Sequence, residues 1–181
     1  NIDFKLKKAT PMLPVGYVVA HEQFVVKAYE FPTVEGILKA AVTKENVNET
    51  LPEVQKEDVN AWLKLTAGDV AVTFNKWNGW IDYLDVNGEP MLEEGYAITS
   101  DFWRAPTDND YGASIQNKLR AWKSPHQKMT SFEVNDLSDG AGKQVVVKYD
   151  MPTVEAQLVM TYTLTNKGEL IINEAMTVNK E

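Results

Sequence analysis

Alternating apolar and polar residues dominate the chain from Trp62 onward and predict short β-strands. Val70, Val72 and Phe74 are separated by small or polar residues, which is the two-residue period of a strand with one buried face. Three further segments have strand-like patterns, at residues 144–149, 156–165 and 169–178. Together these patterns predict an all-β domain, built as an antiparallel sandwich.

Turn signals between the apolar runs support the antiparallel arrangement. Asn78-Gly79 and Asn87-Gly88 each lie between apolar runs. Asn-Gly is the strongest short signal for a β-hairpin, because both residues tolerate the positive φ of a type I′ turn. Residues 166–168 fit a three-residue hairpin loop with Gly168 in the left-handed conformation.

One segment has a helical period. Ile115, Leu119 and Trp122 are spaced so that they share one face of a helix. Ser114 is a candidate N-cap, and Pro125 would end the helix. We therefore expect one short helix that covers the core.

The N-terminal third of the chain has weaker patterns. Residues 17–29 are rich in valine and aromatic residues, which predicts a strand. Residues 36–52 show no clean period, and residues 53–59 are polar and charged, which is typical of a connector.

The charge and composition of the chain indicate which kinds of molecule it binds. The 181-residue chain carries a net charge of -8, which disfavours nucleic acid and anionic membrane surfaces because both attract cationic proteins. A neutral ligand or another protein surface fits better. The absence of cysteine excludes disulfides, thiolate catalysis and cysteine metal sites.

The chain shows no targeting segment. No run of about 18 apolar residues is present, so we expect no membrane span, and the first residues lack the apolar core of a signal peptide. The missing initiator methionine indicates an excised piece or a processed chain.

Residues 102–112 form the densest cluster of functional groups, with two aromatic residues, a cation, a proline and two carboxylates. Arg104 offers a rigid fork of donors that suits bidentate pairing with Asp108 or Asp110. Asp108 and Asn109 are expected to form side-chain turns onto nearby backbone N–H groups. Together with Pro106, these residues are expected to form a compact structural cluster. Removal of the Arg104 side chain is expected to lower the stability of the chain.

Two other interpretations of this cluster fit poorly. Glycoside hydrolysis needs two carboxyl groups that face each other across a sugar, whereas Asp108 and Asp110 are two residues apart. An EF-hand loop that began at Asp108 would need glycine at its sixth position and glutamate at its twelfth, but Ala113 and Leu119 stand there. We expect no metal site here, and His21 and His126 are too far apart in sequence to suggest a metal pair or a catalytic dyad.

Three tryptophans offer another kind of site. Trp77, Trp80 and Trp103 could form a platform on which a sugar ring stacks. Hairpin tryptophans more often fill a core or pair across strands, so core packing is the favoured interpretation.

The run at residues 101–112 closely resembles a signature in the C-terminal part of the large bacterial β-galactosidases, the family-2 glycoside hydrolases. Residues 15–24 are similar to the strand that closes the second immunoglobulin-like linker domain of that family. Residues 74–80 resemble the first hairpin of the following domain, a β-supersandwich similar to galactose mutarotases, and Trp122-Lys123 matches an aromatic-basic pair beyond the signature. The resemblance implies that residues 1–52 are a remnant of the linker domain with a connector, and that residues 53–181 are the N-terminal part of the supersandwich.

The same resemblance limits the function. The catalytic glutamates of that family lie in an upstream TIM barrel that no segment here resembles, so no catalytic residue and no cofactor are expected in this chain. The resemblance implies a non-catalytic structural module of a β-galactosidase-like glycoside hydrolase. An autonomous carbohydrate-binding module is the alternative, and a mutarotase-type sugar epimerase is less well supported.

The expected partners follow from the same resemblance. They are the TIM barrel of the parent enzyme and, through it, the carbohydrate substrate. Self-association through open strand edges is also expected. The resemblance implies a soluble bacterial protein, from the cytoplasm or the periplasm.

Overall fold

The computed structural model describes residues 1–42 and 52–179, and the chain divides into two compact units, Asn1–Thr33 and Val34–Glu181. The boundary after residue 52 that the resemblance implied stays a prediction. Of the stretch at 36–52, which shows no clean period, residues 43–51 lie outside the described residues, and the part before them belongs to helix α1 (Val34–Val42).

The first unit is built on one antiparallel hairpin. Strand β1 (Ile2–Lys5) pairs with β2 (Val18–Glu22). The strand predicted at residues 17–29 is therefore correct over its first part and wrong beyond Glu22. The residues that follow are exposed, among them Phe24, Val25 and Val26. This unit has no third strand, so these residues have no neighbouring strand with which to form backbone hydrogen bonds.

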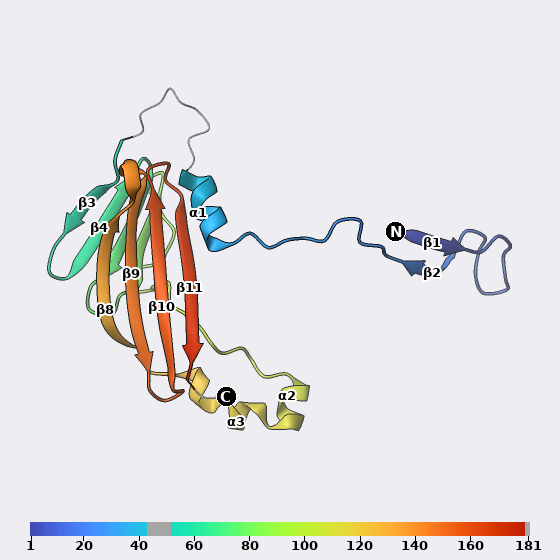
Figure 1. Ribbon diagram of the computed structural model, residues 1–181. Coiled ribbons are helices and arrows are strands. Elements are labelled where there is room, and N and C mark those ends of the chain that lie inside the picture. Colours follow the sequence, from blue (N-terminus) through green and yellow to red (C-terminus); the bar gives the residue numbers. More distant parts are fainter. Residues whose placement is uncertain (43–51, 180–181) are drawn as a thin grey trace. The chain divides into compact units, whose positions relative to one another are not determined.

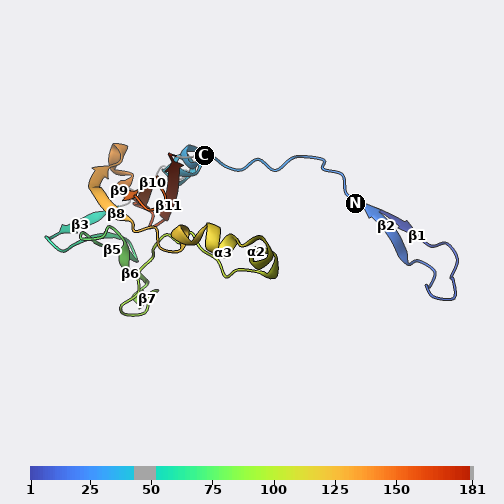
Figure 2. The same ribbon diagram turned by 90° about the horizontal axis from the view of Figure 1, so that it is seen from below.

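The second unit is a sandwich of two antiparallel sheets, as predicted (Figure 1). One sheet has the strand order β3-β4-β5-β6-β7 and the other the order β11-β10-β9-β8, so every neighbour within a sheet is also a neighbour in sequence. Figure 2 shows the two sheets as separate layers. The strands are β3 (Gln55–Asp58), β4 (Trp62–Ala67), β5 (Val70–Asn75), β6 (Ile81–Val86), β7 (Glu89–Pro90), β8 (Lys128–Asp136), β9 (Gly142–Met151), β10 (Ala156–Thr165) and β11 (Leu170–Val178).

The core lies between the sheets and is centred on β5, β9 and β10. Phe74 of β5 meets Tyr162 of β10 edge to face, with ring centroids 5.1 Å apart. Alternate residues of the facing strands are buried, as the sequence pattern predicted: Leu63, Leu65, Val72, Val145, Val147, Tyr149, Leu158, Met160, Tyr162 and Leu164. The period-two pattern therefore identified the inward faces correctly.

The turns follow their sequence signals with one exception. Asn87 and Gly88 both have positive φ, 58° and 79°, and link β6 to β7 by the expected two-residue turn. Gly168 has a φ of 81°, as expected for the loop between β10 and β11. The link between β5 and β6 is instead a longer loop at residues 76–80, in which Gly79 has positive φ and Asn78 does not.

This longer loop is held by packing onto β9. The Tyr149 hydroxyl donates a 2.8 Å hydrogen bond to the Asn78 carbonyl, and the Gly79 N–H donates to the Asn75 carbonyl. Trp80 stacks on the Tyr149 ring, with centroids 4.5 Å apart and the planes within 10°. Burial raises the pKa of Tyr149, so the phenol keeps its proton for the bond to Asn78.

Strand β11 carries two residues of the inward face that stay partly exposed. Ile172 lies opposite Tyr162 and Met176 opposite Leu158, so both share the face of core residues. Both are nevertheless exposed, and β11 is an edge strand. This uncovered edge agrees with the expectation of self-association, which stays a prediction.

The helical content differs from the single helix that was predicted. The described residues contain α1 (Val34–Val42), α2 (Asp108–Ala113), α3 (Ile115–Lys118) and the 3-10 turns η1 (Arg120–Lys123) and η2 (Ser138–Gly140). Ser114 has a φ of 57° and interrupts the helix between α2 and α3 instead of capping it with its side chain. The segment does end before Pro125, as expected. No helix among the described residues is long and apolar enough to cross a membrane.

Three strands, β1, β3 and β8, were not predicted. Strand β3 lies where the sequence indicated a connector, because its residues form an exposed edge and need no apolar pattern. Strand β8 has a bulge between Met129 and Ser131 that breaks the two-residue period.

Candidate functional site

The signature run forms an extended segment followed by a helix. Thr107 is the N-cap of α2, with an extended backbone, and its N–H donates a 2.7 Å hydrogen bond to the Asp110 carboxylate. Asp110 is thus the third residue of the helix and satisfies a backbone donor that the helix leaves free. The side-chain turns expected for Asp108 and Asn109 are wrong, since both residues begin the helix.

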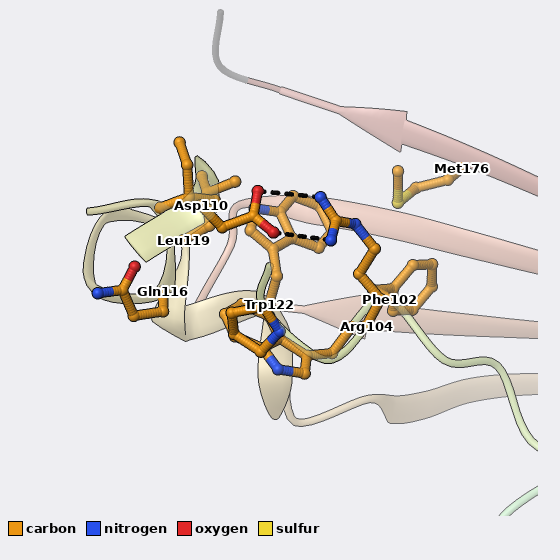
Figure 3. Close-up of a pocket in the computed structure, with 10 residues that line it drawn as sticks. Phe102, Arg104, Asp110, Gln116, Leu119, Trp122 and Met176 are labelled. Carbon is orange, nitrogen blue, oxygen red and sulfur yellow. Dashed lines mark hydrogen bonds and ion pairs between the residues drawn. The ribbon is translucent and has the colours of Figure 1, made fainter. Parts of the chain in front are cut away.

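Arg104 and Asp110 form the ion pair that the sequence predicted (Figure 3). The two side chains meet through two contacts, Nη1 to Oδ2 at 2.7 Å and Nη2 to Oδ1 at 2.9 Å. The alternative partner, Asp108, is exposed. The pair connects the extended segment before Pro106 to the first turn of α2. The two ends of the signature run are therefore held together by a direct contact.

Asp110 is held in its ionised form. The hydrogen bond from the Thr107 N–H, followed by the bonds from Arg104, lowers the pKa of Asp110 below its usual range. The Thr107 hydroxyl donates a further hydrogen bond to Asp110 Oδ2 at 3.0 Å. A carboxylate with these four contacts keeps no proton to donate near neutral pH. Asp110 is therefore unsuited to act as a general acid.

Removal of the Arg104 side chain tests this pair. The side chain of Arg104 is 67% exposed and that of Asp110 is 14% exposed, so solvent screens the pair from one side. We expect Arg104→Ala to lower the melting temperature by no more than about 3 °C at pH 7, and Arg104→Lys to recover part of the loss because an ammonium cannot make both contacts.

The pH dependence of that loss has a definite sign. Because the pKa of Asp110 is lowered on folding, the pair stabilises the chain above the unfolded pKa of about 4 and ceases to do so as the pH falls through the folded value. The difference in melting temperature between wild type and Arg104→Ala should therefore shrink below pH 4. A difference that stays constant down to pH 2 would contradict the assignment.

An apolar hollow of about 410 Å³ lies beside the ion pair. Its aromatic wall is formed by Phe102, Trp103 and Trp122, and Met176 of β11 lines it from the other side. Phe102 and Trp122 contact each other edge to face at 5.8 Å. We call this hollow the aromatic cavity, and its size is that of a small-molecule site.

Polar groups in the aromatic cavity are few. Arg104, Asp110 and Gln116 line it, and the Gln116 Oε1 atom is buried without a hydrogen-bond partner among the described residues. Ile115 and Leu119, which the helical pattern assigned to core cover, also line it. Pro106 completes the wall. Neither Gln116 nor Met176 was predicted from the sequence. Gln116 is a polar residue of the helical segment with no pattern of its own, and Met176 reaches the cavity from the distant strand β11.

The three tryptophans considered for sugar stacking lie in different environments. Trp80 is 8% exposed and packed on Tyr149, so neither ring face is open. Trp77 is 76% exposed on the hairpin loop. Trp103 is half-buried and lines the aromatic cavity. They do not form one platform, and Trp103 alone is placed beside a hollow of ligand size.

Metal-ligating side chains do not gather in the described part of the chain. No group of three or more histidine, aspartate or glutamate side chains there is placed to hold an ion. His21 lies in β2 of the first unit, and His126 lies in the loop before β8 of the second.

Comparison with known protein families identifies one that matches this chain. Residues 66–180 match the family model described as beta galactosidase small chain. The chain belongs to this family. The match covers most of the sandwich unit and confirms the resemblance that the signature run indicated.

Several β-galactosidases match most of the chain. A β-galactosidase of Priestia megaterium is 28% identical over 97% of this chain, and one of Lactobacillus delbrueckii subsp. bulgaricus is 30% identical over 71%. A β-galactosidase of Clostridium acetobutylicum is 26% identical over 93% of the chain. These matches cover 16%, 13% and 17% of the relatives' own lengths, so this β-galactosidase small-chain sequence corresponds to a small part of each.

Proposed function

We propose that this chain is a non-catalytic structural module of a β-galactosidase-like glycoside hydrolase. The observation that carries the proposal is the state of Asp110. It is the carboxylate that lines the aromatic cavity, and it is bound by Arg104 and Thr107. Hydrolysis of a glycoside needs two carboxyl groups across a sugar, one of them protonated as the general acid. Asp110 is held as the anion, so it cannot be that acid, and no second carboxyl group among the described residues lines the cavity with it.

In this proposal the chemistry belongs to another part of the parent protein. The parent would cleave terminal β-galactosides with retention, through two carboxylates on a TIM barrel. The sandwich unit would pack on that barrel and help to wall the sugar pocket. Arg104, Pro106, Asp108, Asn109 and Asp110 would hold the signature run in shape at that contact. The N-terminal hairpin unit would come from the preceding linker domain.

The isolated chain is therefore expected to show no glycosidase activity. Purified protein is incubated with a chromogenic β-galactoside at pH 7, beside a complete β-galactosidase as the positive control. Release of the chromophore should not exceed the buffer rate. Sustained turnover that Asp110→Asn abolishes would overturn the proposal, because it would place a catalytic carboxylate in this chain.

A carbohydrate-binding role is the second candidate, and the aromatic cavity is the observation that favours it. Trp103 and Trp122 line this hollow, and pyranose rings stack on aromatic faces. Titration with galactose, followed by tryptophan fluorescence, separates the two candidates. Saturable binding with a Kd below about 1 mM that Trp103→Ala removes would favour the binding module, and no response would favour the structural module.

A further inference from the structure

A second hollow is lined by other residues of the η1 turn and has a different character. It has a volume of about 480 Å³ and is lined by Arg120, Lys123, Ser124, His126 and Thr153, with Ala121. We call it the cationic hollow. Neither the structural role proposed above nor the signature run accounts for it.

The geometry of η1 explains why the two hollows differ. A 3-10 helix has three residues per turn, so residues three apart lie on the same side. Leu119 and Trp122 accordingly line the aromatic cavity, whereas Arg120 and Lys123 line the cationic hollow. The short turn thus separates apolar from cationic side chains.

The loop that follows η1 is fixed in place. The Thr153 hydroxyl, in the turn between β9 and β10, donates a 2.7 Å hydrogen bond to the Pro125 carbonyl, and Pro125 is buried. His126 has a φ of 56°, an uncommon conformation for a residue with a side chain that often accompanies function. The hollow is therefore lined by two stretches of the sandwich unit, residues 120–126 and Thr153, that a hydrogen bond holds together.

The two cations of this hollow, Arg120 and Lys123, take part in none of the ion pairs within the described residues. The chain as a whole carries a net charge of -8, so a concave group of unpaired cations is unusual for it. Such a group concentrates positive potential in one place.

We propose that the cationic hollow binds a phosphoryl group, either as free phosphate or as part of a small phosphorylated metabolite. Arg120 supplies a planar fork of donors that matches phosphate oxygens, and Lys123 supplies a compact point charge. The Ser124 hydroxyl lies in the same wall as a neutral donor. The volume also leaves room for an organic group beyond the phosphoryl oxygens.

Thermal unfolding with inorganic phosphate tests the site. We expect 20 mM phosphate to raise the melting temperature of the full chain by about 2–4 °C over sodium chloride of equal ionic strength at the same pH. In amide NMR spectra the shifted signals should include Ser124, His126 and Thr153. An equal rise in sodium chloride would overturn the proposal.

Paired variants locate the effect. The double variant R120Q/K123Q should weaken phosphate binding at least tenfold, and both positions are exposed, so the fold should be retained. Lys56→Gln on β3 is a single-charge control, because it removes one exposed lysine charge outside the hollow, and its effect per charge is compared with that of the double variant. Binding that survives in R120Q/K123Q, or that falls equally in Lys56→Gln, would show a general charge effect and refute the site.

A titration with two compounds, inorganic phosphate and a hexose 6-phosphate, distinguishes the two sources of the phosphoryl group. Hexose 6-phosphate that binds more tightly than inorganic phosphate would identify a phosphorylated metabolite as the ligand, and equal binding would identify free phosphate. Both outcomes require the site, whereas failure of both compounds to bind would exclude it. The proposed structural role is tested separately by the glycosidase assay, so either proposal can fail without the other.

Discussion

Replacement of Gly79 with alanine is expected to destabilise the chain by roughly 2–5 kcal/mol, from left-handed strain and overpacking together. Gly79 has a φ of 80°, and an added Cβ would fall against the Tyr149 hydroxyl and 2.5 Å from Val147 Cγ1. Both neighbours are buried in β9 and have little room to move. Thermal unfolding followed by circular dichroism should show a fall of about 10 °C in melting temperature.

Gly88 provides the matched control for this substitution. Its φ is 79°, nearly that of Gly79, but an added Cβ would meet nothing within 4 Å. Gly88→Ala should therefore report the backbone strain alone, about 1–2 kcal/mol. Equal losses in the two variants would mean that the loop at residues 76–80 does not pack on β9.

The second large effect is expected for Trp80→Ala. Trp80 is buried and stacked on Tyr149, so its removal leaves a cavity between the hairpin and β9. Truncation of a buried tryptophan costs about 3–5 kcal/mol, which urea unfolding can measure. Trp77→Ala, at an exposed position of the same loop, should change stability by less than about 0.5 kcal/mol.

These two tryptophans also separate packing from ligand binding. A normal unfolding curve for Trp80→Ala, combined with loss of a galactose response, would place Trp80 in a sugar site and contradict its assignment to the core. A large loss for Trp77→Ala would show that the loop is more tightly packed than its exposure indicates.

Local patterns predicted the strands well where one face is buried. Val145, Val147 and Tyr149 alternate and are all in the core, because a regular strand converts period two directly into two faces. The same rule failed for β8, where the bulge after Met129 shifts the alternation, and for β3, whose residues are exposed on both faces. Irregular and edge strands lack the pattern on which such predictions depend.

The signature run was predicted in its main contact but not in its conformation. The charges of Arg104 and of the two nearby aspartates indicated an ion pair, because a guanidinium and a carboxylate bind each other through two parallel hydrogen bonds. The helix at Asp108 was missed, although Thr107 with an acidic residue three positions later is a known start signal. Met176 could not be found from the sequence, because its contribution to the aromatic cavity depends on the packing of β11.

The order of strands has a consequence for how the chain folds. Each sheet joins only sequence neighbours, so each can assemble from hairpins with short loops, the kind of contact that forms early. The segment between β7 and β8 supplies most of the aromatic cavity, and Met176 supplies the rest. We infer that this segment gains its tertiary contacts after the two sheets have come together, because Met176 of one sheet lines the cavity with it. We therefore expect the candidate site to be the last part of the sandwich to order during refolding and the first to open under denaturant.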